Sequence, residues 1–599
     1  MFDGPSHHPR AEVMMMVRSR WLRCGLFGAA GALALVTLAA CKDESPKGPS
    51  TDPPSEDPTE TQDPLLVADK MDLLLVVDNS MSMADKQEIL APSVARLIEN
   101  LVNPRCVDES GAPLPSASQP TDPSASCPSG SSREHTPVRD LHVGVISSSL
   151  GAVGGNGCDS AAVTNPDDRA HLLTRGPVAT VPTYQDLGYL DWDPGQTHLP
   201  VPGEADLGAL ESRLRDLVIG VGELGCGYEM PLEAAYRFLA DPAPYESLVL
   251  DESTGLRAPV GVDQTLLAQR AAFVRPDSLV AVVLLSDEND CSIDVQGPGQ
   301  LFLNMDPFYR ATSICETNPD DACCTSCGLP TPEGCAPDPV CANPRYTDAE
   351  DPPNLRCSDT KRRYGVDILN PTARYANALS SASIDPTRSD LAVVEGSSAV
   401  DNPLFAGGRP REFVTLTTIV GVPWQDLVTD PTDPTSDLKT SSQMEADGTW
   451  SWLLGRDALD PFMRESLEPR TGSSPATHES VSAPNSINGG DYQHPNGYWL
   501  QAACTFDLDT AIPDSPSCVE GDSPAQLCDG TTQYAAPAYP GGRQLSVVRA
   551  LGDRGIAGSV CPPDVGEQVF DPATVAARAH AYNASVDELE LRVSPYLQE

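Results

Sequence analysis

The sequence predicts an α/β fold in which a doubly wound, mostly parallel sheet carries helices on both faces. Three observations support this fold class. The expected strands are apolar along their whole length, which is typical of a parallel sheet covered on both sides. They alternate with segments whose apolar residues recur at helical spacing. Polar side chains directly follow at least two of them, at the edge where open α/β sheets bind ligands. The expected strands lie near residues 73, 142, 280, 415 and 557.

The first two strands are separated by one helix and one long loop. Residues 73–77 are all apolar and predict a buried strand. Helical spacing of apolar residues predicts a helix over 82–101. Residues 104–138 are rich in Pro and Ser and predict an inserted loop, and the run 141–146 predicts the second strand.

The rest of the chain alternates in the same way but carries long insertions. Further strands are expected at 278–285, 413–422 and 555–560. Further helices are expected at 207–218, 231–239, 266–273, 375–379, 545–551 and 574–593. Loop insertions, in addition to 104–138, are expected at about 150–205, 297–370 and 424–540. We therefore expect a single domain over residues 67–599, with a modest core and long irregular loops.

The N-terminus has the features of an export signal. Basic residues precede a short apolar stretch at 25–40, the pattern of a secretory signal peptide over residues 1–40. Met14 to Met16 offers alternative starts, because the residues before it add nothing that a signal needs. Residues 41–66 are rich in Pro, Ser, Thr and acidic residues, and they predict a disordered acidic tether.

The end of the apolar stretch resembles a bacterial lipobox. It reads Leu38-Ala39-Ala40-Cys41, which implies that Cys41 carries a lipid and becomes the mature N-terminus. The membrane would then be contacted through this lipid only. Lys42 follows the cysteine, and by analogy with sorting in enteric bacteria this favours the outer membrane or cell surface.

Charge and cysteine content describe an exported protein. The formal net charge is −46, which argues against nucleic-acid binding because such a polyanion repels phosphate backbones. Of 18 cysteines, Cys24 and Cys41 fall in the leader, and the remaining 16 are expected to form disulfides. Cys106 and Cys127 form a plausible local pair. A bridge between Cys226 and Cys291 would brace two polar loops, although connectivity cannot be read from sequence.

One cysteine-rich segment has an alternative interpretation. Cys323-Cys324-x-x-Cys327 contains a C-x-x-C spacing, which is found in zinc sites. The export signal and the even number of cysteines favour disulfides here as well.

Polar side chains directly follow two predicted strands. Asp78, Ser80 and Ser82 follow the first strand in the pattern D-x-S-x-S, and Asp287 follows the strand at 278–285. The carboxyl ends of parallel strands form the edge at which open α/β sheets bind ligands. Carboxylate and hydroxyl oxygens suit a hard cation that keeps several waters. The alternative is that D-x-S-x-S only forms a turn and caps the next helix.

The D-x-S-x-S loop after a buried strand resembles the metal-ion-dependent adhesion site of von Willebrand factor A (VWA) domains. The resemblance implies that Asp78, Ser80, Ser82 and Asp287 bind Mg²⁺, or Mn²⁺ or Ca²⁺ in its place. The lipobox, the acidic stalk and the runs G-C-G-Y-E and S-D-E-N-D-C-S resemble the large exported VWA lipoproteins of soil and predatory proteobacteria such as myxobacteria. The resemblance covers residues 70–150, 205–295, 412–424 and 540–565.

The chain departs from the family pattern at one ligand. The family places a Thr a few residues before the position of Leu232, and this chain has Cys226, Gly227, Tyr228 and Glu229 there. Glu229 is a candidate replacement. Glu288 and Asp290 follow Asp287, where they would support the ligands, compensate for the missing one, or only form the turn.

The resemblance implies binding without catalysis. In the family, an Asp or Glu of a protein ligand fills the open coordination position of the metal. The sequence contains no G-x-S-x-G, H-E-x-x-H or G-x-x-x-x-G-K-[ST] motif, so we expect no enzyme. Two alternatives remain: a metal-free structural scaffold, and a hydrolase whose groups meet only on folding.

Overall fold

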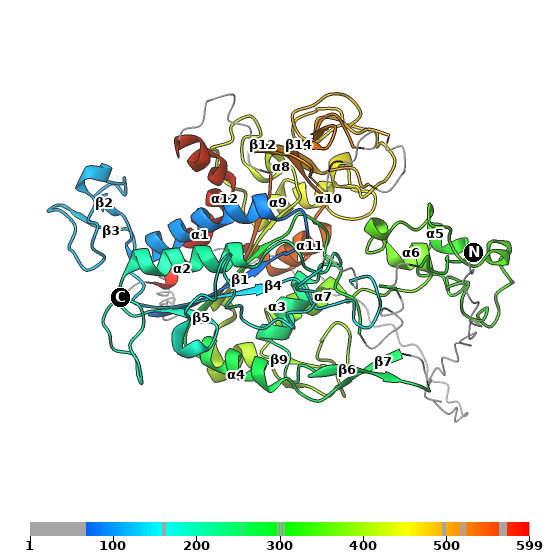
Figure 1. Ribbon diagram of the computed structural model, residues 1–599, viewed down its shortest axis with the longest axis horizontal. Helices are drawn as coiled ribbons and strands as arrows, with labels where there is room; N and C mark the ends of the chain where they lie inside the picture. Colours follow the sequence, from blue (N-terminus) through cyan, green and yellow to red (C-terminus); the bar gives the residue numbers. More distant parts are fainter. Residues whose placement is uncertain are drawn as a thin grey trace, which may run out of the picture. The chain divides into compact units, whose positions relative to one another are not determined.

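The computed structural model describes residues 68–158, 163–253, 256–295, 299, 302–303, 306–493, 499–515, 518, 523–561 and 572–597 (Figure 1). The described residues belong to one compact unit. The predicted signal peptide, the predicted lipidation site Cys41 and the predicted tether lie outside them. Within the described residues, no helix has the length and apolar character needed to cross a bilayer.

A six-stranded sheet forms the centre of the fold, in the order β15-β11-β8-β1-β4-β5. Strand β1 (Lys70–Val77) lies between β8 (Leu279–Leu285) and β4 (Asp140–Ser147) and is parallel to both. Strands β11 (Val414–Val420) and β15 (Gly555–Ser559) continue the parallel pairing. The edge strand β5 (Tyr189–Trp192) is antiparallel. The prediction of a mostly parallel α/β sheet is therefore confirmed.

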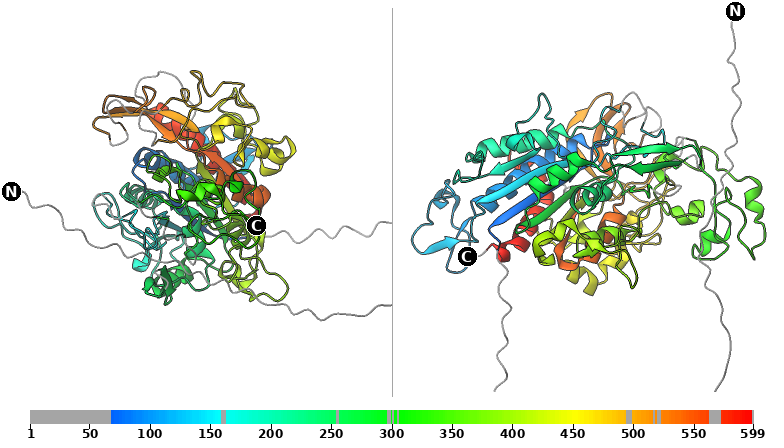
Figure 2. Two further views of the ribbon diagram at one scale, coloured as in Figure 1. Left: turned by 90° about the vertical axis from the view of Figure 1, so that its right-hand side faces the viewer. Right: turned by 90° about the horizontal axis from the view of Figure 1, so that it is seen from below.

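Helices cover both faces of this sheet because successive strand residues point to opposite sides. Leu73, Leu75 and Val77 pack with α1 (Ala84–Val102), α2 (Leu207–Gly220) and α12 (Pro572–Val593). Leu74 and Val76 pack with the second layer. That layer consists of α3 (Pro231–Leu239), α4 (Gln264–Phe273), α7 (Thr372–Ala378) and α11 (Gly542–Leu551). Figure 2 shows the sheet between the two layers.

Several regions expected to be loops contain strands. Within the predicted insertion 150–205 lies β5, and β2 (Cys106–Asp108) pairs with β3 (Ser131–Arg133) in the insertion 104–138. A hairpin joins β6 (Ser247–Asp251) and β7 (Leu256–Val260). The late insertion forms a small sheet of β12 (Cys504–Ile512), β14 (Thr532–Ala538) and β13 (Cys528–Asp529). These strands are short or lie on the surface, so they lack the apolar runs that reveal buried strands.

The insertions also contain short helices. They are α5 (Ile314–Thr317), α6 (Thr360–Tyr364), α8 (Trp424–Leu427), α9 (Ser441–Ala446) and α10 (Thr449–Leu453). A two-residue pair, β9 (Ser383–Ile384) with β10 (Val400–Asp401), completes the regular structure.

All 16 cysteines after Cys41 form disulfides, as predicted. The pairs are Cys106–Cys127, Cys158–Cys226, Cys291–Cys357, Cys315–Cys324, Cys323–Cys335, Cys327–Cys341, Cys504–Cys561 and Cys518–Cys528. The expected local pair of Cys106 with Cys127 is correct. The predicted bridge between Cys226 and Cys291 is wrong, because Cys226 pairs with Cys158 and Cys291 pairs with Cys357. The zinc interpretation of 323–327 is also wrong, since its three cysteines enter three different disulfides.

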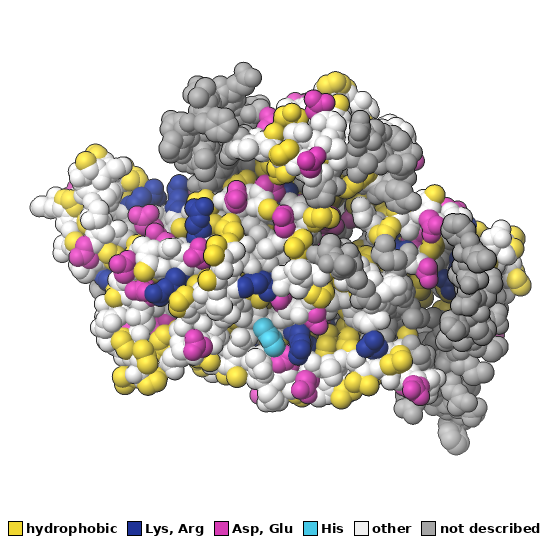
Figure 3. All heavy atoms as spheres, in the orientation of Figure 1, with side chains coloured by type: hydrophobic (Ala, Val, Ile, Leu, Met, Phe, Trp, Pro, Cys, Tyr) yellow, Lys and Arg dark blue, Asp and Glu magenta, His cyan; other side chains and the backbone are white. Residues whose placement is uncertain are grey.

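Figure 3 shows acidic and basic side chains interspersed over one face of the molecule, with the acidic ones more numerous and scattered. The acidic side chains do not form a single patch there.

Candidate functional site

The two predicted carboxylates meet at the carboxyl edge of the sheet. Strands β1 and β8 are neighbours, and Val77 pairs with Leu285 at their last positions. The backbone N–H of Asp78 donates to the carbonyl of Leu285 at 2.9 Å, which extends the ladder by one residue. Asp78 and Asp287 therefore follow adjacent strand ends, and the side chains of both are fully buried.

Hydroxyl and amide donors surround Asp78. Its Oδ1 accepts a hydrogen bond from the backbone N–H of Ser80 at 2.8 Å and from the hydroxyl of Ser148 at 3.2 Å. Its Oδ2 accepts one from the hydroxyl of Ser286 at 2.7 Å. Burial, followed by the nearby charge of Asp287, nevertheless raises the pKa of Asp78 to about 6. Desolvation outweighs the hydrogen bonds that favour the charged form.

Asp287 is much less well provided with donors. The ammonium of Lys86 lies 3.1 Å from its Oδ2 and forms an ion pair with it. Its Oδ1 has no hydrogen-bond partner among the described residues. Buried polar groups normally find hydrogen-bond partners, so Asp287 marks a place where positive charge is only partly supplied.

Lys86 is a site residue that the sequence analysis missed. Its side chain is 1% exposed, and its ammonium also donates to the carbonyl of Ser82 at 2.8 Å and pairs with Asp85 at 3.2 Å. The ring of Phe506, from β12, lies 5.5 Å from the ammonium. The only sequence signal was a lysine one turn after the second serine, in the first turn of α1. Nothing in the local pattern shows that it reaches across to Asp287.

Two glutamates complete the acidic cluster, which we define as Asp78, Glu229, Asp287 and Glu288. Glu229 is buried, and burial, with Glu288 and Asp78 nearby, raises its pKa well above the usual value. Burial, then Asp287 and Asp78, raises the pKa of Glu288 to about 8. Among the described residues, the only ion pair of this cluster is the one between Asp287 and the buried ammonium of Lys86.

The other predicted residues take different positions. The hydroxyl of Ser80 is buried and has no hydrogen-bond partner among the described residues. Ser82 is half-buried, and its carbonyl oxygen, not its hydroxyl, contacts Lys86. Asp290 is turned away: it accepts from the N–H of Leu232 at 3.1 Å and pairs with Arg543 at 3.2 Å. Asp290 therefore supports the start of α3 and does not join the acidic cluster.

Two serines after a third strand contribute hydroxyls beside Asp78. Ser148, directly after β4, donates to Asp78, and its neighbour Ser149 donates to the side chain of Asn79 at 2.8 Å. No role was predicted for either serine. The signal was present, because they follow a third strand that ends at the same edge of the sheet.

The acidic cluster fits a hard divalent cation. Its donors are carboxylate and hydroxyl oxygens, and all of its residues except the half-buried Glu288 are buried. Among the described residues, Oδ1 of Asp287 and the hydroxyl of Ser80 have no hydrogen-bond partner, and Oδ2 of Asp287 has only Lys86. This is the donor set that Mg²⁺ or Ca²⁺ prefers. Asp78, Ser80, Glu229, Asp287 and Glu288 could hold such an ion.

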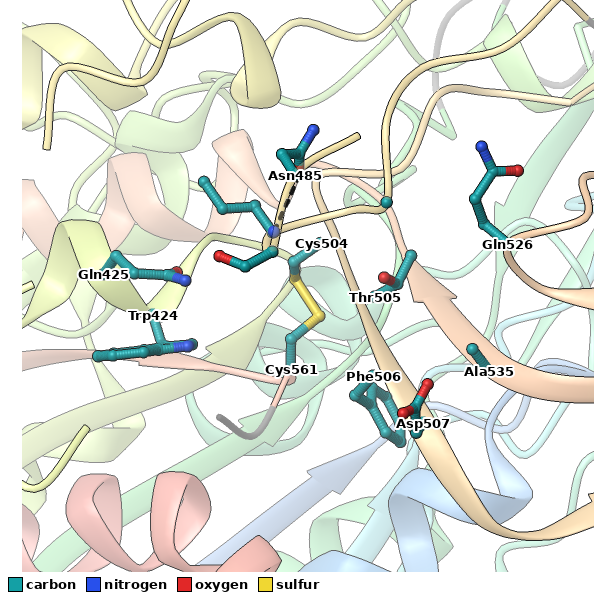
Figure 4. A pocket seen from close by; sticks show the side chains of 13 residues that line it. Trp424, Gln425, Asn485, Cys504, Thr505, Phe506, Asp507, Gln526, Ala535 and Cys561 are labelled. Carbon is teal, nitrogen blue, oxygen red and sulfur yellow. Dashed lines mark hydrogen bonds between the residues drawn. A yellow bond between two sulfur atoms is a disulfide. The ribbon is translucent and has the colours of Figure 1, made fainter. Parts of the chain in front are cut away.

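A cavity of about 240 Å³ lies beside this site, between α8 and the small late sheet (Figure 4). Trp424, Phe506 and the Cys504–Cys561 disulfide line it. Phe506 thus separates the cavity from Lys86. None of the four carboxylates of the acidic cluster lines it.

A second group of residues that could hold a metal ion lies at the opposite, amino edge of β4. Ligand atoms of Asp140, Asp191 and His198 lie within 4.8 Å of one another. The sequence analysis gave these three residues no role.

Comparisons with known proteins add no family to this description. No protein-family model matches the chain, and no curated protein matches it. The fold and the site thus define the class: an α/β protein with a mostly parallel sheet, many disulfides and a buried acidic cluster at the carboxyl edge.

Proposed function

We propose that the chain is a VWA-type lipoprotein that binds a protein ligand through a divalent cation held in the acidic cluster. The ion would be held by Asp78, Ser80, Asp287 and Glu229. Glu288 would lie beside these ligands, and Ser82 would lie in the same loop as Ser80. The bound ion would attract an aspartate or glutamate of the ligand, and no bond would be made or broken. Lipidation of Cys41 and display at the outer membrane or cell surface are part of this proposal.

The observation that carries the proposal is that Oδ1 of Asp287 and the hydroxyl of Ser80 have no hydrogen-bond partner among the described residues, while Oδ2 of Asp287 has Lys86 alone. A group of buried carboxylates is costly unless enough positive charge neutralises it. The raised pKa of Asp78 and Glu288 points the same way, because both acids lack compensating charge. Met81, between the two serines, is 56% exposed, so the loop that carries the hydroxyls reaches the surface where a ligand would approach.

A second candidate function follows from Lys86. Its ammonium already pairs with Asp287, so a cation from solution has to compete with it for this carboxylate. If the ammonium supplies all the positive charge that the cluster needs, the chain is a metal-free scaffold. The two candidates differ in whether added metal stabilises the fold.

Thermal unfolding of the full chain in millimolar Mg²⁺ and in EDTA separates them. Metal binding predicts a higher midpoint in Mg²⁺, because a ligand that binds only the folded state stabilises it. Asp287→Asn should remove this difference. An equal midpoint in both buffers, with no heat of Mg²⁺ binding by calorimetry, would support the scaffold instead.

A further inference from the structure

The Asp140, Asp191 and His198 group lies on the opposite edge of the sheet from the acidic cluster and is independent of it. Asp140 is the first residue of β4, Asp191 belongs to the paired strand β5, and His198 comes from the loop after β5. We propose that these three residues, with His142 beside them, bind a zinc-type divalent cation. This second metal site would have no part in the proposed binding of a protein ligand.

His198 is oriented as a metal-binding imidazole would be. Its Nδ1 lies 2.8 Å from Oδ2 of Asp191, and its Nε2 lies 3.4 Å from Oδ2 of Asp140. Two ligands bound to one zinc at about 2.0–2.2 Å are roughly 3.3–3.6 Å apart in tetrahedral geometry. Measured from Oδ1 of Asp191, the Nδ1 of His198 lies at 3.0 Å and the Nε2 of His142 at 3.7 Å, which is close to this spacing. The contact of Asp140 with Nε2 holds the other side of the ring, as carboxylates do for zinc-bound histidines.

His142 provides an independent observation that points to a cation. It is 6% exposed and lies next to Asp191 across the β4–β5 ladder. Its Nδ1 lies 2.9 Å from the carbonyl oxygen of Phe273, which can only accept, so Nδ1 carries a hydrogen. Its Nε2 faces Oδ1 of Asp191 at 3.7 Å, which is longer than a hydrogen bond. A neutral imidazole there turns a lone pair toward a carboxylate, and a cation between them would satisfy both groups.

The loop that carries His198 is held firmly. The carboxylate of Asp193 accepts backbone N–H groups of Thr197 at 2.9 Å and of His198 at 2.8 Å. The N–H of Glu204 donates to the carbonyl of Asp191 at 2.7 Å, which closes the loop onto β5. The three ligands therefore come from two paired strands and one pinned loop, the kind of rigid support that metal sites need.

The charges of this edge leave room for a cation. Arg275 pairs with both Asp72 and Asp140, so one guanidinium serves two carboxylates. Asp191 has only the two histidines near it among the described residues. The side chains of Asp140 and His198 are 21% and 22% exposed, so water can reach the remaining coordination positions.

The donor set selects the metal. Mixed imidazole and carboxylate ligands suit Zn²⁺, whereas the oxygen-only acidic cluster suits Mg²⁺ or Ca²⁺. The two sites should therefore differ in metal preference. The structural consequence of zinc here is to fasten the edge strand β5 and its loop to β4.

The test is metal titration of the full chain after chelator treatment and dialysis. Zn²⁺ is titrated against a chromophoric chelator, and Co²⁺ is followed by its visible absorption. The wild type should bind one equivalent of Zn²⁺ that His198→Gln does not bind, with loss of the Co²⁺ band. His171→Gln is the matched control, because His171 also contacts a buried aspartate, Asp263 at 2.8 Å, but lies outside the group. It should bind zinc as the wild type does.

Two results would overturn the proposal. One is a wild type that retains no zinc at micromolar free metal, which would make His198 a simple ion-pair partner of the two aspartates. The other is equal zinc binding by His198→Gln and the wild type. If His198→Gln is unfolded by circular dichroism, Asp140→Asn replaces it with the same expected loss. Asp287→Asn should leave the zinc equivalent intact, so failure of the ligand-binding proposal would not affect this result.

Discussion

The pattern D-x-S-x-S occurs at residues 78–82 and again at 122–126. The pKa of its aspartate is raised in the first copy and lowered in the second. In both, the aspartate Oδ1 accepts the N–H of the first serine at 2.8 Å. Asp78 is buried beside Asp287, and its pKa is raised to about 6. Asp122 lies in an exposed loop, and the hydrogen bonds from Ser124 lower its pKa.

The comparison shows that the pattern specifies a turn and that its position in the sheet makes it a candidate site. The turn hydrogen bond is local, so it forms in both places. The second carboxylate, the buried ammonium and the unpartnered oxygens come from other parts of the chain. They are present only where the turn follows a central strand.

The largest expected effect is at Lys86, the group that distinguishes the two copies most. Lys86→Met leaves the buried Asp287 without its ammonium, and removing one member of a buried pair costs about 3–5 kcal/mol. We expect this loss in EDTA at pH 8, measured by chemical unfolding. Millimolar Mg²⁺ should recover much of it if the cluster binds metal. A variant that is equally unstable with and without Mg²⁺ would favour the metal-free scaffold.

Asp78→Ala should abolish the stabilisation by Mg²⁺. At a metal concentration of 100 Kd this stabilisation is about 2.7 kcal/mol in the wild type. The measurement is the difference in unfolding free energy between Mg²⁺ and EDTA, so that any cost of the substitution itself cancels. A difference as large as in the wild type would show that the ion binds elsewhere.

The pH dependence should have a definite sign. Glu288 has its pKa raised from 4.5 to about 8 and Asp78 from 3.8 to about 6, so the metal-free fold is favoured by their protonation. Their contribution to stability is complete below pH 3.8–4.5 and is lost as the pH rises through 6 and 8. A metal ion needs the deprotonated acids, so stabilisation by Mg²⁺ should grow from pH 5 to pH 8. Each proton released on binding raises the affinity tenfold per pH unit, which is about 1.4 kcal/mol.

A Mg²⁺ effect that is constant between pH 5 and pH 8 would contradict this expectation. In that case Glu288 and Asp78 would not be among the groups that lose protons when the metal binds. Calorimetry in buffers of different ionisation heat would count the released protons directly.

The smallest effect should be at the exposed copy. Asp122→Ala removes the hydrogen bonds that the N–H and hydroxyl of Ser124 donate to the carboxylate, and because these groups are open to water the stability should change little. Its response to Mg²⁺ should equal that of the wild type. A reduced stabilisation of Asp122→Ala by Mg²⁺ would show that the exposed pattern binds metal as well, and would contradict the conclusion that only the buried copy is a candidate site.

Much of the fold was predictable because its signals are local. The apolar runs at 73–77 and 278–285 revealed β1 and β8, and helical spacing revealed α1 and α2. The short edge strand β5 and the late sheet of β12, β13 and β14 were missed. Their pairing depends on neighbours and disulfides that no local pattern shows.

The candidate site was predictable in part for the same reason. Asp78 and Asp287 each follow a recognisable strand, so both were expected at the carboxyl edge of the sheet, and the resemblance to VWA domains implied that they meet. Lys86, Ser148 and the whole zinc-type group were missed. Lys86 and Asp287 are 201 positions apart in the sequence, and they meet only because α1 packs on the sheet.

The sequence by itself determined the order of strands and helices, the strand ends that carry acids, and the fact that 16 cysteines pair. Periodicity and residue type carry this information, because they act over a few neighbouring residues. The tertiary structure alone decided which cysteines join, which lysine neutralises Asp287, and that His198 lies between two aspartates. These contacts join residues from different elements, and only the packing of helices and loops on the sheet brings their side chains together.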